Sequence, residues 1–579
     1  MAVDRRRRRS HRSNRRSHRN AEPALGRRSH GRRSLRVSET AARVRLVCPR
    51  VSGASVAPRY RQPEPAHERR ALFARDLSVL HDRRGSAALP ARHRGRTSGD
   101  QRRDPDRPLC VLGSLGLRRL TRAILDVVSG DALDRFIAAR RERFTEELRE
   151  LCAIPCEASD HTALDAAARW CRDRLAAAGF ADARELRAGG APALVVGETG
   201  SGKRVLVGVQ HYDVQPAVPL DLWKTPPYQP ALRDGAMYAR GVDDNKGHLL
   251  LRIQAIEAHR AVLGELPIRV RFLIEGEEES GSPNLAKLLA LEPGLTDADG
   301  ALKEGGALDS EGRSILSLGG KGILYCHFRV RTMTRDAHSG GATHYPNAAG
   351  RLAHAFASLV DVKGRVQIEG FYDDVRQPTD ADRAMLERMP FDARATRAVV
   401  GIEAFAFGRT DDEAKWASVF EPTCNVCGIE SGYNGPGSKT VIPAEATGKI
   451  DFRLVPDQDP MKIAALLRAH LDRHGFGDVE FSAEEGEHPY RGPADAPLVR
   501  AVAAVAEEAF GTPAVLVPSS GGTSPMWVVC NPRRMANVTL GMGHPGAGAH
   551  APNEHILLEN YWRALRATAR LYSEFATAR

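Results

Sequence analysis

Acidic and histidine side chains gather in five short clusters between residues 211 and 554, most of them beside glycines or after an apolar run. The stretch 274–281 reads IEGEEESG and follows the apolar run 270–274, which has the character of a buried strand. Four carboxylates this close together repel one another, and burial raises the cost of each charge. Divalent cations beside the stretch would remove this repulsion, so we take it as a candidate metal site.

A second cluster, His211-Tyr-Asp213, ends the predicted strand at 205–209. Positions i and i+2 of a strand share a face, so the His211 ring and the Asp213 carboxylate should point the same way, with Tyr212 toward the opposite face. A carboxylate beside a histidine can orient a metal ligand. Taken alone, the pair also fits an ordinary polar strand end.

Three further clusters complete the set. RGVDDNKG at 240–247 precedes a predicted helix, KEGG at 303–306 carries one isolated carboxylate, and HAPNE lies in a glycine-rich segment at 541–554. Imidazole and carboxylate ligands together suit zinc, cobalt or manganese better than a soft thiolate site would. Each cluster is weak evidence by itself, but five in this order, mostly at strand-to-loop junctions, predict a metal centre.

Alternating strands and helices must hold these clusters in place. Strands are predicted at 193–196, 205–209 and 268–274, and helices at about 131–151, 162–178, 246–261 and after Pro283. This alternation is typical of an α/β domain with a mainly parallel sheet and helices on both faces.

The pattern changes at about residue 322 and returns at about residue 487. Strands at 323–330 and 447–455 with helices at 347–359 and 461–474 predict an inserted α+β domain of two layers. A helix at 497–510, a strand at 514–518 and a helix at 557–575 resume the first pattern. We therefore expect a catalytic domain in two parts, 126–321 and 487–579, interrupted by an inserted domain at 322–486.

Residues 1–125 differ in composition from the rest of the chain. Residues 1–122 hold 33 arginines, no lysine and 10 acidic residues, a net charge of +23, which leaves −11 for the remainder. Such a segment cannot bury enough apolar surface to fold, so we expect a disordered extension or a start-site artefact. The alternative from another class is a basic nucleic-acid-binding protein that uses this arm. Because the segment has neither a folded nucleic-acid module nor a regular interleaving of aromatic residues with its arginines, nucleic acid is not the expected partner.

Two other features bear on location. No stretch approaches the ~20 apolar residues of a membrane span. The nine cysteines are scattered and odd in number, which favours reduced thiols and a cytoplasmic protein.

One near-match to a nucleotide-binding motif is discarded. GETGSGK at 197–203 lacks the final Ser or Thr of a phosphate-binding loop, because Arg204 stands there, and a predicted strand follows where a helix is required. A glycine-rich hairpin turn is the preferred interpretation.

The order of the five clusters resembles the two-metal zinc peptidases and deacylases, a family that includes carnosine dipeptidases, carboxypeptidase G, aminoacylase, acetylornithine deacetylase and succinyl-diaminopimelate desuccinylase. The resemblance rests on HYDVQP, RGVDDNKG, EGEEESGS, KEGG and HAPNE, and it covers about residues 130–579. The DVQP and EESGS segments are most similar to the dipeptidase branch.

The resemblance implies roles for individual residues. Two divalent ions, zinc in preference to manganese or cobalt, would be held by Asp244 as the bridge, His211 and Glu304 at one ion, and Glu279 and His550 at the other. Asp213 would hold the His211 ring, and Glu278 would be the general base. A cis peptide bond is implied after Asp244. Asp309 lies close enough in sequence to compete with Glu304, since the dipeptidase branch often has aspartate at this position.

The same resemblance adds four more residues, three in the inserted domain and one, Thr523, in the second part of the catalytic domain. His338 would stabilise the oxyanion in the active site of a second copy, which makes the inserted domain a dimerisation or lid domain and the protein a homodimer. Arg453 and Thr523 would bind the substrate carboxylate, and Asn425 would be a further oxyanion donor. The function expected is a metal-dependent amide-bond hydrolase for dipeptides or short peptides with a free carboxylate. An N-acyl amino acid deacylase is the alternative.

Overall fold

The structure is a computed structural model that describes residues 130–579. These residues belong to one compact unit. The extension expected at 1–125 lies outside the described residues. None of the helices in 130–579 combines the length and the apolar character needed to cross a membrane.

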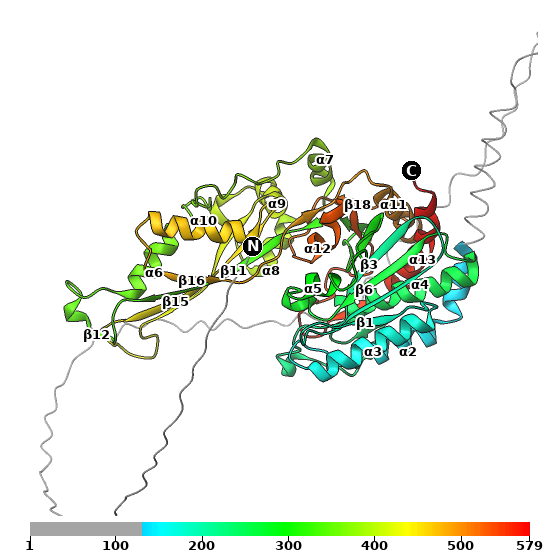
Figure 1. Cartoon of the computed structure of the whole chain (residues 1–579), viewed down its shortest axis with the longest axis horizontal. Helices are drawn as coiled ribbons and strands as arrows, with labels where there is room; N and C mark the ends of the chain where they lie inside the picture. Colours follow the sequence, from blue (N-terminus) through cyan, green and yellow to red (C-terminus); the bar gives the residue numbers. More distant parts are fainter. Residues whose placement is uncertain (1–129) are drawn as a thin grey trace, which may run out of the picture. The chain divides into compact units, whose positions relative to one another are not determined.

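A six-stranded sheet forms the centre of the catalytic domain (Figure 1). Its strands in spatial order are β1 (Arg184–Leu186), β2 (Leu194–Thr199), β6 (Arg269–Glu275), β3 (Val205–His211), β7 (Gly300–Lys303) and β19 (Asn537–Thr539). The four strands from β6 to β19 are parallel, and β1 and β2 add an antiparallel edge. The predicted α/β class with a mainly parallel sheet is confirmed.

Helices cover both faces of this sheet, as alternate residues of β2 demonstrate. Val195 packs into a core with five helices, namely α2 (Arg141–Cys152), α3 (His161–Ala177), α4 (Gly247–Leu263), α11 (Pro497–Phe510) and α13 (Leu558–Thr577). Leu194 and Val196 pack on the other face against α5 (Leu285–Leu289) and α12 (Met526–Cys530). A strand buried on both faces reads as a continuous apolar run, which is why the sequence signal was clear.

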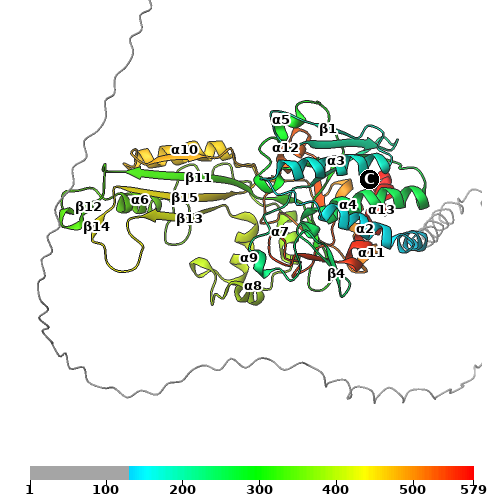
Figure 2. The ribbon, with the colours of Figure 1, turned by 90° about the horizontal axis from the view of Figure 1, so that it is seen from below.

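The inserted domain has a second sheet, entirely antiparallel, with two helices packed against it (Figure 2). Its strands in spatial order are β13 (Thr423–Ser431), β15 (Glu445–Leu454), β11 (Gly322–Arg331) and β16 (Glu480–Ala483), and its helices are α6 (Ala348–Ala357) and α10 (Pro460–Arg473). Alternate residues of β11, such as Leu324 and Cys326, are buried under these helices. The two-layer α+β character is confirmed.

Smaller elements complete the described chain. They are the three-stranded sheets β4 (Ala231–Arg233), β5 (Ala236–Tyr238), β20 (His555–Leu557) and β8 (Ala307–Leu308), β9 (Ser314–Ser317), β18 (Val515–Val517); the pairs β10 (Gly319–Gly320) with β17 (Tyr490–Arg491) and β12 (Ala337–His338) with β14 (Val441–Ile442); and the helices α7 (Asp380–Arg388), α8 (Ala393–Val400) and α9 (Asp411–Phe420). The sequence did not predict the three helices, which bury only a small apolar cluster of their own.

The predicted hairpin at 197–203 is wrong. Strand β6 lies between β2 and β3, so the two strands that flank this turn do not pair with each other. The glycines serve a different purpose: a Cβ on Gly200 or Gly202 would lie within 2.1 Å of the carbonyl oxygen of Ile268 or Pro267. The turn therefore needs glycine because another backbone segment approaches it closely.

Candidate metal centre

Three parallel strands bring the acidic and histidine clusters to one edge of the central sheet. His211 is the last residue of β3 and pairs in register with Glu275, the last residue of β6. Glu278 and Glu279 lie in the turn after β6, and Glu304 follows β7 directly. Because parallel strands end at the same edge, residues separated by up to 93 positions become neighbours.

The loop before α4 supplies Asp244. The peptide bond between Asp244 and Asn245 is cis, as the resemblance implied. The backbone of this loop is held by Glu554, whose two carboxylate oxygens accept the N–H groups of Gly241 (2.8 Å), Asp243 (2.9 Å) and Asp244 (3.0 Å). The buried guanidinium of Arg240 donates to the same carboxylate at 2.7 Å.

The histidines flank Asp244 on two sides. The Nε2 atom of His211 lies 3.2 Å from Asp244 Oδ1, and the Nε2 atom of His550 lies 3.2 Å from Asp244 Oδ2. Glu279 Oε2 is 3.1 Å from the His550 ring, and Glu304 Oε2 is 3.8 Å from the His211 ring. Asp244 thus faces both halves of the cluster, one oxygen to each.

Asp213 has a wider role than the sequence indicated. Its backbone oxygen lies 3.1 Å and its carboxylate 3.4 Å from Nδ1 of His211. The same carboxylate accepts the backbone N–H groups of Glu278 and Glu279 at 3.3 and 3.0 Å. One buried carboxylate therefore fixes the histidine ring and the glutamate turn together. Tyr212 points away, into the core, where its hydroxyl donates to Ala193.

The donor set fits a pair of divalent cations. Donor atoms of His211, Glu278 and Glu304 lie within 4.8 Å of one another, as do those of Asp244, Glu279 and His550. Glu279 Oε1 and Glu304 Oε2 are buried oxygens with no hydrogen-bond partner in residues 130–579. Buried carboxylate oxygens normally have a hydrogen-bond partner. A bound cation would supply the missing partner for these two.

Electrostatics of the cluster point the same way. Burial raises the pKa of the Glu278 carboxyl well above its usual value, and the nearby Glu304 charge adds to the effect. Although burial acts against it, hydrogen bonds to His211 and His550 hold the pKa of Asp244 well below its usual range. Hydrogen bonds to Asp244 and Glu279 raise the pKa of His550 to about 10. The surplus of acidic groups favours a cation at this place.

The four glutamates of the IEGEEESG stretch divide into two pairs. Glu278 and Glu279 belong to the cluster, and no side chain in the described residues donates a hydrogen bond to the Glu278 carboxylate. Glu275 is buried beneath them, and burial raises the pKa of its carboxyl well above the usual value. Glu277 accepts two hydrogen bonds from the amide of Asn284.

A cleft of about 1160 Å³ opens onto this cluster. Arg453 and Thr523 line it, and the Arg453 guanidinium donates to the Thr523 hydroxyl at 2.8 Å. Glu487 lines it as well, and burial raises the pKa of its carboxyl to about 7. Within residues 130–579 no group donates a hydrogen bond to the Glu487 carboxylate.

Three residues that the sequence analysis named as candidates do not line the cleft. His338 is exposed and lines a separate hollow on the inserted domain. Asn425 is exposed on β13 and donates to Asp451 at 2.7 Å. Asp309 is engaged by the Arg313 side chain at 2.7 Å, and it does not line the cleft.

The sequence did not predict the roles of three supporting residues, although two of them lie in the motifs HYDVQP and HAPNE. Gln215 of HYDVQP donates to Glu279 Oε2 at 3.0 Å, and Glu554 of HAPNE holds the Asp244 loop. Arg252 of α4 is buried and donates at 2.6 Å to the carbonyl of Lys303, next to Glu304. The motifs signalled the first two, whereas Arg252 carried no local signal.

Comparison with known proteins gives consistent matches. The family description Peptidase family M20/M25/M40 matches residues 209–574. The Beta-Ala-His dipeptidase of Mus musculus is 30% identical over 398 residues, which are 66% of this chain and 80% of that protein. The Cys-Gly metallodipeptidase DUG1 of Saccharomyces cerevisiae is 26% identical over 76% of this chain and 97% of its own.

Solved structures agree with these relatives. An M20 family metallo-carboxypeptidase from Sulfolobus solfataricus superimposes with a TM-score of 0.70 at 35% identity, covering 75% of this chain and 99% of that one. Human carnosine dipeptidase 1 superimposes with a TM-score of 0.64 at 26% identity, covering 77% and 98%.

Replacing Glu554 by glutamine should weaken metal binding about 10- to 100-fold, the usual effect of losing a group that orients ligands. The amide cannot accept all four hydrogen bonds, and it leaves the Arg240 guanidinium without a counter-charge. Competition between the protein and a coloured chelator for zinc measures the change, and a thermal melt separates it from loss of fold. Glu559→Gln, on the exposed face of α13, is the matched control. Unchanged zinc affinity in Glu554→Gln would show that the Asp244 loop does not depend on Glu554.

Proposed function

This chain belongs to peptidase family M20/M25/M40, and on that premise we propose a residue-level mechanism and a substrate class for it. It is a metal-dependent hydrolase that cleaves the peptide bond of dipeptides. The observation that carries the mechanism is Asp244, which has one oxygen toward His211 and the other toward His550.

In the proposed centre, His211 and Glu304 would hold one divalent ion, Glu279 and His550 would hold a second, and Asp244 would serve both. Bound ions would make the attacking water more acidic and polarise the scissile carbonyl. Zinc is the proposed ion, because mixed imidazole and carboxylate ligands suit it. Asp213 keeps the His211 ring and the glutamate turn in place.

Glu278 is the proposed general base. Its carboxylate reaches the cluster, has no hydrogen-bond donor of its own among the described residues, and sits where burial raises its pKa. It takes a proton from the attacking water and passes that proton to the leaving amine.

The cleft favours a dipeptide with both termini free. Arg453 and Thr523 would receive the substrate carboxylate, and Glu487 would bind the ammonium group; all three line the cleft. An ammonium beside Glu487 would also keep that carboxylate ionised despite burial. An N-acyl amino acid has no ammonium group to bind there, so the deacylase alternative is not favoured.

A homodimer is the proposed assembly. The outer edge of β13 has no neighbouring strand in the sheet, and Val426 and Ile429 on it are 46% and 56% exposed. An exposed strand edge with apolar side chains is a common interface. In the dimer, His338 and Asn425 would act on the substrate in the cleft of the partner subunit.

We propose the domain boundaries 126–321, 322–486 and 487–579, supported by an apolar cluster from Leu324 to Val479 that no residue from outside enters. We also propose a cytoplasmic location, because all seven cysteines in the described residues are unpaired. Fractionation of producing cells and metal analysis of the native enzyme test the location and the zinc assignment.

Replacing Glu278 by glutamine should lower kcat for dipeptide hydrolysis by roughly 10²- to 10⁴-fold, the usual contribution of a general base. Metal content and KM should change little, because the amide keeps the size of the side chain. Chelation should abolish wild-type activity, and zinc or manganese should restore it. Glu277→Gln is the control. Full activity in Glu278→Gln would refute the assigned base, and activity that survives chelation would refute the metal dependence.

Replacing Glu487 by glutamine should lower kcat/KM for a free dipeptide about 10- to 100-fold, because a charge-assisted hydrogen bond to the ammonium is lost. The N-acetylated form of the same dipeptide should be cleaved by variant and wild type at equal rates. Glu480→Gln, exposed on β16, is the control. An equal loss on both substrates would assign Glu487 to the fold of the cleft and not to amine recognition.

Mixing two inactive variants tests the contribution of the partner subunit's His338. His338→Ala and Glu278→Gln should each be nearly inactive alone, because every cleft in them lacks one group. Random exchange of subunits should restore roughly a quarter of wild-type activity, since half of the dimers then contain one complete cleft. Sedimentation confirms that mixed dimers form, and mixed dimers without activity would contradict the arrangement.

A further inference from the structure

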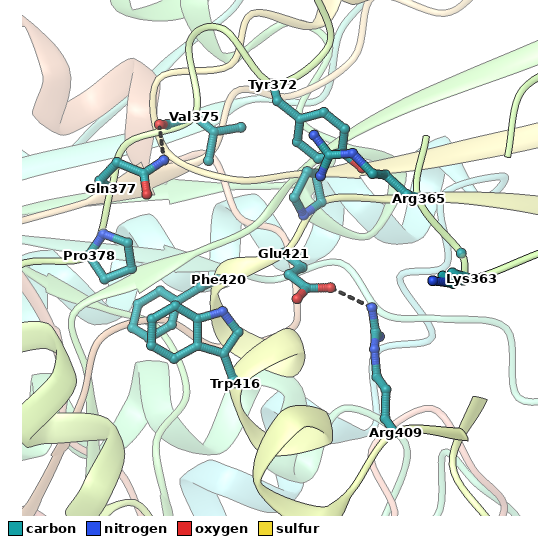
Figure 3. A pocket seen from close by; sticks show the side chains of 12 residues that line it. Lys363, Arg365, Tyr372, Val375, Gln377, Pro378, Arg409, Trp416, Phe420 and Glu421 are labelled. Carbon is teal, nitrogen blue, oxygen red and sulfur yellow. Dashed lines mark hydrogen bonds and ion pairs between the residues drawn. The ribbon is translucent and has the colours of Figure 1, made fainter. Parts of the chain in front are cut away.

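A cup on the inserted domain, separate from the catalytic cleft, has two unlike walls (Figure 3). Its volume is about 320 Å³, at the small end of the range for ligand sites. The rings of Trp416 and Phe420, at the end of α9, form an apolar wall, with their centroids 4.8 Å apart. Opposite them stand three basic side chains, those of Lys363, Arg365 and Arg409.

Positive charge in the cup is in excess. Arg409 forms an ion pair with Glu421. Within residues 130–579, no carboxylate lies within ion-pairing distance of Lys363 or Arg365. Asp361 is engaged in holding the turn, since its Oδ1 accepts the backbone N–H groups of Lys363 and Arg365 at 2.9 Å each. Two cationic side chains therefore stand beside an apolar wall without a directly paired carboxylate.

The basic wall is also ordered. The guanidinium of Arg365 lies over the ring of Tyr372, 4.2 Å from its centroid, and the Tyr372 hydroxyl accepts the backbone N–H of Val366 at 3.0 Å. A stacked guanidinium keeps its N–H groups available while losing freedom, so less entropy is lost when an anion binds. No N–H group of the Arg365 side chain donates to an acceptor within the described residues.

We propose that this cup is a second ligand site, which binds a small aromatic carboxylate. The aromatic ring of the ligand packs against Trp416 and Phe420, where offset or tilted aromatic pairs are favourable. Its carboxylate accepts hydrogen bonds from Arg365 and Lys363, because charge-assisted bonds of this kind are among the strongest available to proteins. The site does not depend on the metal centre or on the proposed peptidase mechanism.

Titration of the metal-loaded full-length protein with phenylacetate, followed by saturation-transfer NMR, tests the proposal. Phenylacetate should bind, and phenylacetamide, its neutral analogue of the same shape, should bind at least ~tenfold more weakly because it cannot form the charge-assisted bonds. Equal binding of the two compounds would overturn the proposal.

Variants locate the site. The double substitution Lys363→Gln with Arg365→Gln should lower the affinity for phenylacetate at least ~tenfold, and Trp416→Ala should weaken it too. Lys363 and Arg365 are exposed and Trp416 is half-buried, all three in the inserted domain, so wild-type dipeptidase activity shows that a variant is folded. Arg394→Gln, at an exposed position of α8 in the same domain, should bind phenylacetate like the wild type.

A carboxylate could also bind in the catalytic cleft, so the titration is repeated in Arg453→Gln. Binding that persists in Arg453→Gln and is lost in the double variant supports the cup. Binding that is lost in Arg453→Gln and is unchanged in the double variant assigns phenylacetate to the cleft and overturns the proposal.

Discussion

Repulsion among carboxylates at one edge of the central sheet is the constraint on which the catalytic domain depends. Asp213, Asp244, Glu278, Glu279 and Glu304 meet where β3, β6 and β7 end. A fold can hold so many acidic groups together only if cations neutralise them or if hydrogen bonds fix them. Hydrogen bonds fix the carboxylate of Asp213 beneath the cleft. Oxygens of Glu279 and Glu304 have no hydrogen-bond partner among the described residues and are available to a metal ion.

The hydrogen bonds form two rigid supports, one under each half of the centre. The Asp213 carboxylate accepts the backbone of the glutamate turn and contacts the His211 ring. The buried pair of Glu554 and Arg240 holds the backbone of the Asp244 loop. Because these supports are buried and hydrogen-bonded, they can hold the donor atoms of the cluster in place.

The inserted domain contributes to the cleft from a different layer. Arg453 lies on β15 of the inserted sheet, whereas its hydrogen-bond partner Thr523 belongs to the catalytic domain. The two domains therefore share the wall of the cleft, whereas the acidic and histidine cluster belongs to the catalytic domain alone.

The amino-acid sequence was enough to predict the fold class and the acidic and histidine clusters. Buried strands appear in the sequence as apolar runs. The glycines and carboxylates of the motifs are local features, so they can be recognised without the three-dimensional structure. It also singled out His211, Asp244, Glu279, Glu304 and His550, which the fold brings together. It failed at 197–203, because strand order depends on long-range pairing, and at α7, α8 and α9, which bury few apolar side chains.

Which groups support the centre and which lie apart from it could be seen only once the chain was folded. Arg252, Gln215 and Glu554 act through hydrogen bonds to distant backbone or side chains, and no local pattern encodes such partners. The structure also separated Asp309 from the cleft and joined Glu487 to it. Residue type and spacing fix which chemistry is possible, whereas the packing of strands and loops fixes which side chains share a cavity.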